Sequence, residues 1–132
     1  MKYVIDTHAL IWFLEGNSRL GENAKNVLTD PNSQFVLPAI ALAEAVWIVE
    51  RGRTSIPSAL ALLDAVSADP RLVIYSLDEA VVRRTLTLSP ITEMHDRQIV
   101  ATVLVLADQG ESVTLLTCDL NITEAGLLTI LW

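Results

Sequence analysis

The sequence has little of several residue types, and each shortage narrows the range of functions. Cys118 is the only cysteine among 132 residues, so the chain cannot form an internal disulfide. Because the residues before Cys118 are apolar, we expect a small buried side chain there rather than a redox centre. Nine basic residues stand against 16 acidic ones, giving a net charge of −7. This charge opposes sequence-independent attraction to nucleic acid unless a metal ion, a few placed arginines or a basic partner supplies positive charge locally.

Long apolar runs are also missing. The two longest, 35–43 and 99–107, fall short of the ~20 residues that span a bilayer. Asp6 and His8 interrupt the apolar start of the chain and no cleavage-site pattern follows, so this start does not resemble a signal peptide. Glycine and proline, five of each, occur as isolated turn signals, and no repeat or linker divides the chain. We therefore expect a single domain, residues 1–132, located in the cytoplasm and not in a membrane.

The sequence does contain a regular alternation of short apolar runs and helical segments, as expected of a chain that is 52% hydrophobic and 19% charged. Continuous apolar strands separated by helices predict a mostly parallel sheet covered on both faces, a three-layer α/β/α sandwich. Such sheets bind ligands outside the carboxyl ends of the strands, where the strand order reverses. The predicted strands are 3–6, 34–37, 72–75, 113–117 and 127–131, and the predicted helices are 7–14, 22–29, 38–51, 57–68, 78–88, 96–108 and 122–125.

Four acidic residues fall where such a site is expected. Asp6 and Asp119 follow predicted strands, and Glu44 and Asp96 lie on helices able to flank the same crevice. Asp6 and Asp96 can instead cap helices, Asp119 can form an Asx-turn and Glu44 can pair with an arginine. Glu44 is the hardest to explain structurally, because its helix is apolar nearly all round and a buried carboxylate without a partner is costly. Four converging carboxylates would repel one another unless a divalent cation lay among them, and oxygen ligands favour Mg²⁺ or Mn²⁺ over zinc.

The residues around these acids resemble one known family, the PIN-domain ribonucleases, and within it the VapC-type toxins of bacterial toxin–antitoxin pairs. The resemblance covers nearly the whole chain and implies a PIN-like fold. It also implies that the four acids bind metal and that the activity is endonucleolytic cleavage of RNA. A cognate antitoxin that holds the toxin inactive and a homodimer are further implications. The segments that carry the resemblance, in order, are Val4–Trp12, Ala43–Glu44, His95–Thr102 and Leu116–Asp119.

Five further residues are candidates for supporting roles. Thr7 and Thr117 adjoin two proposed ligands, where their hydroxyls can orient the carboxylates or simply end a strand. Asn121 is either a further oxygen donor or a turn residue. Members of the family often carry another acidic residue near this point, and the amide of Asn121 departs from that pattern. The sequence therefore leaves open whether the site holds one metal ion or two. His95 is a candidate for phosphate contact or proton transfer, and Arg97 for contact with a substrate phosphate.

Trp12 and Trp47 can stack on bases, but their helical spacing among aliphatic residues favours contacts in the core or in a dimer. Two other classes of function stay open beside the nuclease. A phosphorylatable receiver domain shares the parallel α/β sheet, yet it expects an acidic pair after the first strand and a late lysine. This chain has Asp6-Thr7 and no lysine beyond Lys25. The other alternative is a non-catalytic binding or regulatory module that keeps the fold and acts through partner binding.

Overall fold

A computed structural model describes all residues, 1–132, and its centre is one five-stranded sheet. Every neighbouring pair of strands is parallel, as expected from the apolar strands. The strand order is β3-β2-β1-β4-β5, so the order reverses between β1 and β4. The strands are β1 (Lys2–Ile5), β2 (Gln34–Pro38), β3 (Leu72–Tyr75), β4 (Val113–Leu116) and β5 (Ile130–Leu131).

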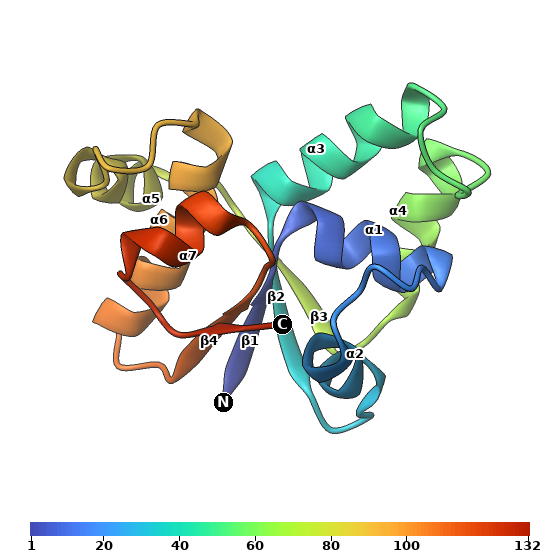
Figure 1. Ribbon diagram of the computed structural model, residues 1–132, viewed down its shortest axis with the longest axis horizontal. Helices are drawn as coiled ribbons and strands as arrows, with labels where there is room; N and C mark the ends of the chain where they lie inside the picture. The colour runs from blue at the N-terminus through green and yellow to red at the C-terminus, as the bar shows by residue number, and fades with distance from the viewer.

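The helices form two layers, one on each side of the sheet (Figure 1). The first layer holds α1 (Thr7–Glu15), α2 (Glu22–Thr29), α3 (Ala39–Glu50) and α4 (Ala59–Ala68), and the second holds α5 (Glu79–Arg84), the 3₁₀ turn η1 (Thr85–Thr87), α6 (Met94–Asp108) and α7 (Leu120–Ala125). Right-handed crossovers explain this division, because the chain reverses its direction across the sheet after β3. The three-layer α/β/α fold is confirmed. No helix combines the length and apolar character needed to cross a membrane.

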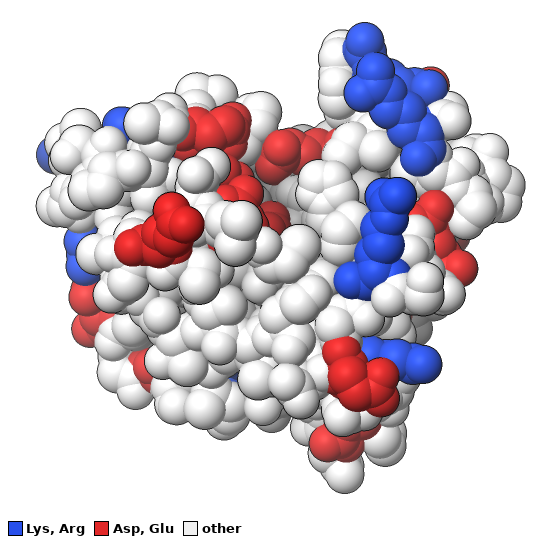
Figure 2. All heavy atoms as spheres, in the orientation of Figure 1, with Lys and Arg blue, Asp and Glu red and all other residues white.

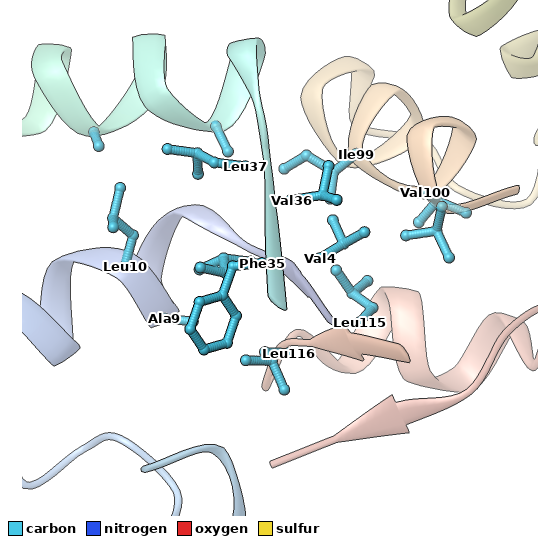
Figure 3. Close-up of a cluster of buried hydrophobic side chains, with 14 of the residues drawn as sticks. Val4, Ala9, Leu10, Phe35, Val36, Leu37, Ile99, Val100, Leu115 and Leu116 are labelled. Atoms are coloured by element: carbon cyan, nitrogen blue, oxygen red, sulfur yellow. The ribbon is translucent and has the colours of Figure 1, made fainter. Parts of the chain in front are cut away.

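The core lies between the sheet and its helical layers (Figure 3). Val4 is the register neighbour of both Val36 and Leu115, and these side chains point toward Ile99 and Val100 of α6. All five are buried. Burial on both faces is the reason that the strand sequences read as nearly continuous apolar runs. Buried strand residues on the side of α1 include Phe35, Leu37 and Leu116.

Capping side chains set several element ends that differ from the predicted ones. The long helix α6 begins at Met94 and not at Asp96, because Glu93 caps it by accepting the Asp96 N–H at 2.7 Å. Helix α4 begins at Ala59 rather than at 57, because the Ser58 hydroxyl accepts an N–H of its first turn. The helix predicted over 78–88 ends at Arg84 and continues as η1, and the last strand shortens to Ile130–Leu131.

Two predictions of burial are wrong. Cys118 is exposed, because it stands in the loop after β4. Trp47 is 60% exposed, so of the two contacts predicted for it the one in the core is absent and the one in a dimer stays a prediction. The sheet is not covered on both faces at β3, where Val73 and Ile74 are 61% and 48% exposed. Strand β3 lies at the edge of the sheet, beyond the reach of the helices that cover the central strands.

Candidate functional site

The carboxyl ends of β1 and β4 lie next to each other at the point where the strand order reverses, and an aspartate follows each strand. Ile5 and Leu116 are the last register partners of the two strands, so the residues after them meet. The Thr117 hydroxyl donates to Oδ2 of Asp6 at 2.5 Å and accepts the N–H of Asp119 at 3.1 Å. One hydroxyl therefore connects the acidic residues of two neighbouring strands.

Asp6 caps α1 and is also deeply buried. Its Oδ1 accepts the N–H of Thr7 at 2.7 Å, and the residue is 8% exposed. Burial raises the pKa of Asp6, an effect that the hydrogen bonds from Thr117 and Thr7 oppose. The negative charge of Asp119 raises this pKa further. Capping alone does not require such burial, because an exposed aspartate caps a helix equally well.

Glu44 has the polar surroundings that its apolar helix led us to expect. The Thr7 hydroxyl donates to Oε1 of Glu44 at 3.1 Å, and Nδ1 of His95 lies 3.2 Å from Oε2. Burial raises the pKa of Glu44, whereas His95 lowers it. Thr7 thus binds Asp6 through its backbone and Glu44 through its side chain, which ties the end of β1 to the middle of α3.

Asp96 stands in the first turn of α6 and faces the other acids. Burial raises its pKa to about 7, together with the charges of Asp119, Glu93, Asp6 and Glu44 in decreasing order. One carboxyl group that responds to four others shows that two strand ends and two helices bring their acids to one region. Figure 2 shows acidic side chains gathered around the hollow between the two helical layers.

Glu93 is an acidic residue of this region that the sequence did not indicate. Its Oε2 caps α6 and its Oε1 lies 3.5 Å from Nδ1 of His95. The spacing of three residues between Glu93 and Asp96 is the available signal, since an N-cap side chain bonds the N–H three residues later. Glutamate is not among the preferred N-cap residues, whereas aspartate is. The sequence therefore pointed to Asp96, and not to Glu93, as the start of this helix.

The remaining candidates, Arg97 and Asn121, make their hydrogen bonds within the chain. Arg97 donates to the backbone carbonyls of Ile91 and Ser89, so its guanidinium holds the loop before α6. Asn121 donates its backbone N–H to Asp119 at 2.8 Å, and its exposed side chain makes no hydrogen bond within the chain. A phosphate contact for Arg97 and an oxygen ligand from Asn121 stay predictions.

The chemistry of this acidic cluster, Asp6, Glu44, Glu93, Asp96 and Asp119, fits a hard divalent cation. All its ligand atoms are carboxylate oxygens, and a cation relieves the repulsion that raises the pKa of Asp96. In this conformation no three histidine, cysteine, aspartate or glutamate side chains are close enough together to hold a metal ion. Metal binding by three or more of these carboxylates therefore requires their side chains to move closer together.

Comparison with known proteins gives the family. The sequence profile of the PIN domain family matches residues 3–127, so the chain belongs to this family. A search of curated protein sequences found no match.

Solved structures share the fold over nearly the whole chain. VapBC2 from Rickettsia felis, bound to a DNA fragment from their promoter, has a TM-score of 0.68 at 18% identity, covering 98% of this chain and 97% of that one. VapC20 from Mycobacterium tuberculosis, described as a Sarcin-Ricin loop cleaving toxin, has a TM-score of 0.68 at 15% identity, covering 94% and 95%. VapBC-1 from nontypeable Haemophilus influenzae has a TM-score of 0.67 at 17% identity, covering 99% and 97%.

Proposed function

We propose that the chain is a Mg²⁺- or Mn²⁺-dependent endoribonuclease and the toxin component of a toxin–antitoxin pair. The observation that carries this proposal is the convergence of acids at the ends of β1 and β4 and on the helices beside them. Burial, together with the charges of these acids, raises the pKa of Asp96 to about 7. Membership of the PIN family supports a nuclease. The description of VapC20, a protein of the same fold, supports RNA as the substrate.

Asp6, Glu44, Asp96 and Asp119 would hold the cation. A bound divalent metal supplies a water of lowered pKa and offsets negative charge on the phosphoryl oxygens. The side chains around the acids do the positioning. The hydroxyls of Thr7 and Thr117 orient the carboxylates of Glu44 and Asp6, as supporting groups of a metal site do.

A cognate antitoxin is the second part of the proposal. An acidic cleft in a chain of net charge −7 complements a basic segment that places an arginine or lysine among the carboxylates. Two of the structural neighbours are VapBC proteins, which supports a partner of this kind. Both the antitoxin and RNA would be met in the cytoplasm. Co-purification with the product of a short neighbouring gene, with loss of nuclease activity in the complex, is the expected result.

A homodimer is the third part. Apolar side chains are exposed on β3 and on the helices before and after it, and an uncovered apolar sheet edge is typical of an interface. Light scattering is expected to show a dimer for the wild type and a monomer for Ile74→Lys. The large exposed apolar residues of these three elements are Leu60, Leu63, Val73, Ile74 and Val82.

Cleavage of RNA by the wild type, Asp6→Asn and Glu44→Gln, each with Mn²⁺, Mg²⁺ or EDTA, tests the nuclease. We expect losses of at least about 100-fold in both variants and in EDTA, with recovery of the wild type when metal returns. Asp64→Asn is the matched control, because Asp64 is an exposed acid on α4 and should leave the rate unchanged. Cleavage without metal, or full activity of either site variant, would contradict the mechanism.

One observation favours the alternative, a non-catalytic binding module. No three acids are close enough in this conformation to hold a metal together. Calorimetric titration with Mn²⁺ separates the two functions. Saturable binding that Asp96→Asn weakens supports the nuclease, whereas no metal binding and no RNA cleavage in a chain that still binds its antitoxin supports the module.

A further inference from the structure

Helix α3 aligns three side chains that lead away from the acidic cluster. Glu44, Trp47 and Arg51 are spaced by three and four residues, which places them along one side of the helix. Trp47 is 60% exposed, although an indole of this size gains more by burial than almost any other side chain. Its position next to the proposed site, rather than in the core, requires an explanation.

Positive charge collects at the outer end of this helix. The Arg51 guanidinium carbon lies 4.5 Å from the centre of the Trp47 ring. Gly52 then takes a positive φ of 69° and turns the chain, so Arg53 follows in the loop close behind. Neither Arg51 nor Arg53 takes part in an ion pair. Figure 2 shows basic side chains on the side of the molecule that carries the far end of α3, apart from the acidic hollow.

A groove joins Trp47 to the acidic cluster. It has a volume of about 470 Å³, within the range of small-ligand sites. Glu44 and His95, which lie 3.2 Å apart, bring the groove to the proposed metal site. The rest of its lining is apolar and therefore suits a ligand with a flat, weakly polar face. The residues that line it are Ile40, Ala43, Glu44, Trp47, Ile48 and His95.

We propose that this groove binds one unpaired nucleobase of the RNA substrate, stacked on Trp47, with a neighbouring phosphate held by Arg51 and Arg53. The inference rests on the proposed function and adds a specificity site to it. Aromatic side chains stack on any base and basic residues track the backbone in single-strand binding sites. Arg51 directly follows α3 and, at 1.5 Å per residue, lies about 10 Å from Glu44 along the helix axis, a span that one nucleotide and its flanking phosphate cover.

The positive charge of Arg51 and Arg53 favours RNA over a basic protein segment as the ligand of the groove. A basic antitoxin segment that complements the acidic cluster would be repelled by Arg51 and Arg53, whereas a phosphate is attracted by both. The Arg51 guanidinium lies over one face of the indole, which holds a positive charge next to the aromatic ring. Since a base is available for stacking only when it is unpaired, the groove selects loops and single strands over duplex RNA.

The test measures binding of two labelled oligonucleotides of eight units, one a single-stranded RNA of mixed sequence and the other an abasic chain with the same phosphates. Asp96→Asn serves as the background so that the RNA is not cut. Trp47→Leu is expected to weaken RNA binding about tenfold, equivalent to ~1.4 kcal/mol of stacking, and to leave abasic binding unchanged. Trp47→Phe, which keeps a ring, should stay within about threefold of the background.

Matched controls separate stacking from general surface effects. Leu86→Ala removes an apolar side chain that is 82% exposed on η1, and it should change neither affinity. Arg51→Ala should weaken both oligonucleotides, because it removes a phosphate contact. Arg83→Ala should not, because Arg83 is an exposed arginine that pairs with Glu79 on α5.

The outcomes distinguish this inference from the function on which it rests. If the wild type cleaves RNA with Mn²⁺ but Trp47→Leu binds both oligonucleotides as the background does, the base site is wrong and the nuclease stands. If Trp47→Leu keeps RNA affinity but becomes monomeric or loses its antitoxin, the groove is a protein contact and the inference is also wrong. If the wild type neither binds metal nor cleaves RNA, both proposals are wrong.

Discussion

The Thr7 hydroxyl lies 3.1 Å from Oε1 of Glu44, although the two residues are 37 positions apart in the sequence. The same threonine donates its backbone N–H to Asp6. A substitution of the side chain therefore removes the contact with Glu44 and leaves the contact with Asp6 in place. Substitutions of Thr7 therefore test whether nuclease activity depends on the position in which the Glu44 carboxylate is held.

Thr7→Val is expected to lower kcat/KM on RNA by about 10- to 100-fold, as the loss of a supporting contact in a metal site does. The shape is nearly conserved, so urea unfolding should show a loss of only about 1 kcal/mol for the missing hydrogen bond. Thr7→Ser restores the hydroxyl and most of the activity. Thr102→Val is the matched control, because Thr102 is equally buried but bonds the carbonyl of Gln98 within α6. Equal losses in Thr7→Val and Thr102→Val would contradict a positioning role.

Stability without metal should fall as the pH rises. The pKa of Asp96 is raised from its ordinary value of 3.8 to about 7 in the folded chain. Below 3.8 the group is protonated in both states and folding carries no penalty, and above about 7 it is ionised in both and the penalty is complete. The pKa values of Asp6 and Glu44 are raised too, so they act in the same direction.

Thermal unfolding in EDTA between about pH 5 and pH 8 measures this effect. Because Asp96 is only partly buried, solvent screening limits its share to on the order of 1 kcal/mol, or about 4 °C in Tm. Asp96→Asn should flatten the dependence of the Tm on pH. Added Mg²⁺ should raise the Tm of the wild type most at the upper end of this pH range. A Tm that increases from pH 5 to pH 8 in EDTA would contradict the raised pKa values of these acids.

Much of the site could be predicted because its residues occupy positions defined by their own segments. Asp6 and Asp119 directly follow apolar runs, and the ends of parallel strands share one edge of a sheet. Glu44 stood out because its helix has no polar side on which a carboxylate could reach water. These inferences need only the local period of the sequence and the general rule for parallel sheets.

The rest depended on contacts between distant segments, which no local pattern contains. The exposure of Trp47 follows from which side of α3 meets the sheet, and an all-round apolar helix leaves that choice open. Arg97 bonds carbonyls of a loop whose path the sequence does not determine. Cys118 is exposed because it stands two residues after the end of β4, whereas Thr117 directly before it is buried.

Arg97 should act on stability rather than on substrate binding. Its guanidinium donates to the carbonyls of Ile91 and Ser89, and a lysine ammonium cannot reproduce that planar pair of contacts. Arg97→Lys is therefore expected to cost about 1–2 kcal/mol in urea unfolding, while the KM for RNA changes less than about twofold. Arg83→Lys is the control, because its surface ion pair with Glu79 should matter little. A large rise in KM at unchanged stability would instead assign Arg97 to a substrate phosphate.

Glu93 combines a structural and an electrostatic role that two substitutions can separate. Glu93→Gln keeps an oxygen that accepts the Asp96 N–H but removes a charge that raises the pKa of Asp96. The acidic limb of the pH–rate profile should then move to lower pH, with the Tm nearly unchanged. Glu93→Ala should shift the same limb and also cost ~1 kcal/mol of stability, because the helix loses its cap.

The control for Glu93 is Glu79→Gln, an exposed acid in the first turn of α5 that pairs only with Arg83. It changes the net charge of the chain by the same amount and should leave the pH–rate profile in place. A limb that moves equally in Glu79→Gln would mean that Asp96 responds to the overall charge of the protein. A limb that moves in Glu93→Gln alone means that the acids around Asp96 set the pH at which the site can bind its metal, because an acid must lose its proton before it can act as a ligand.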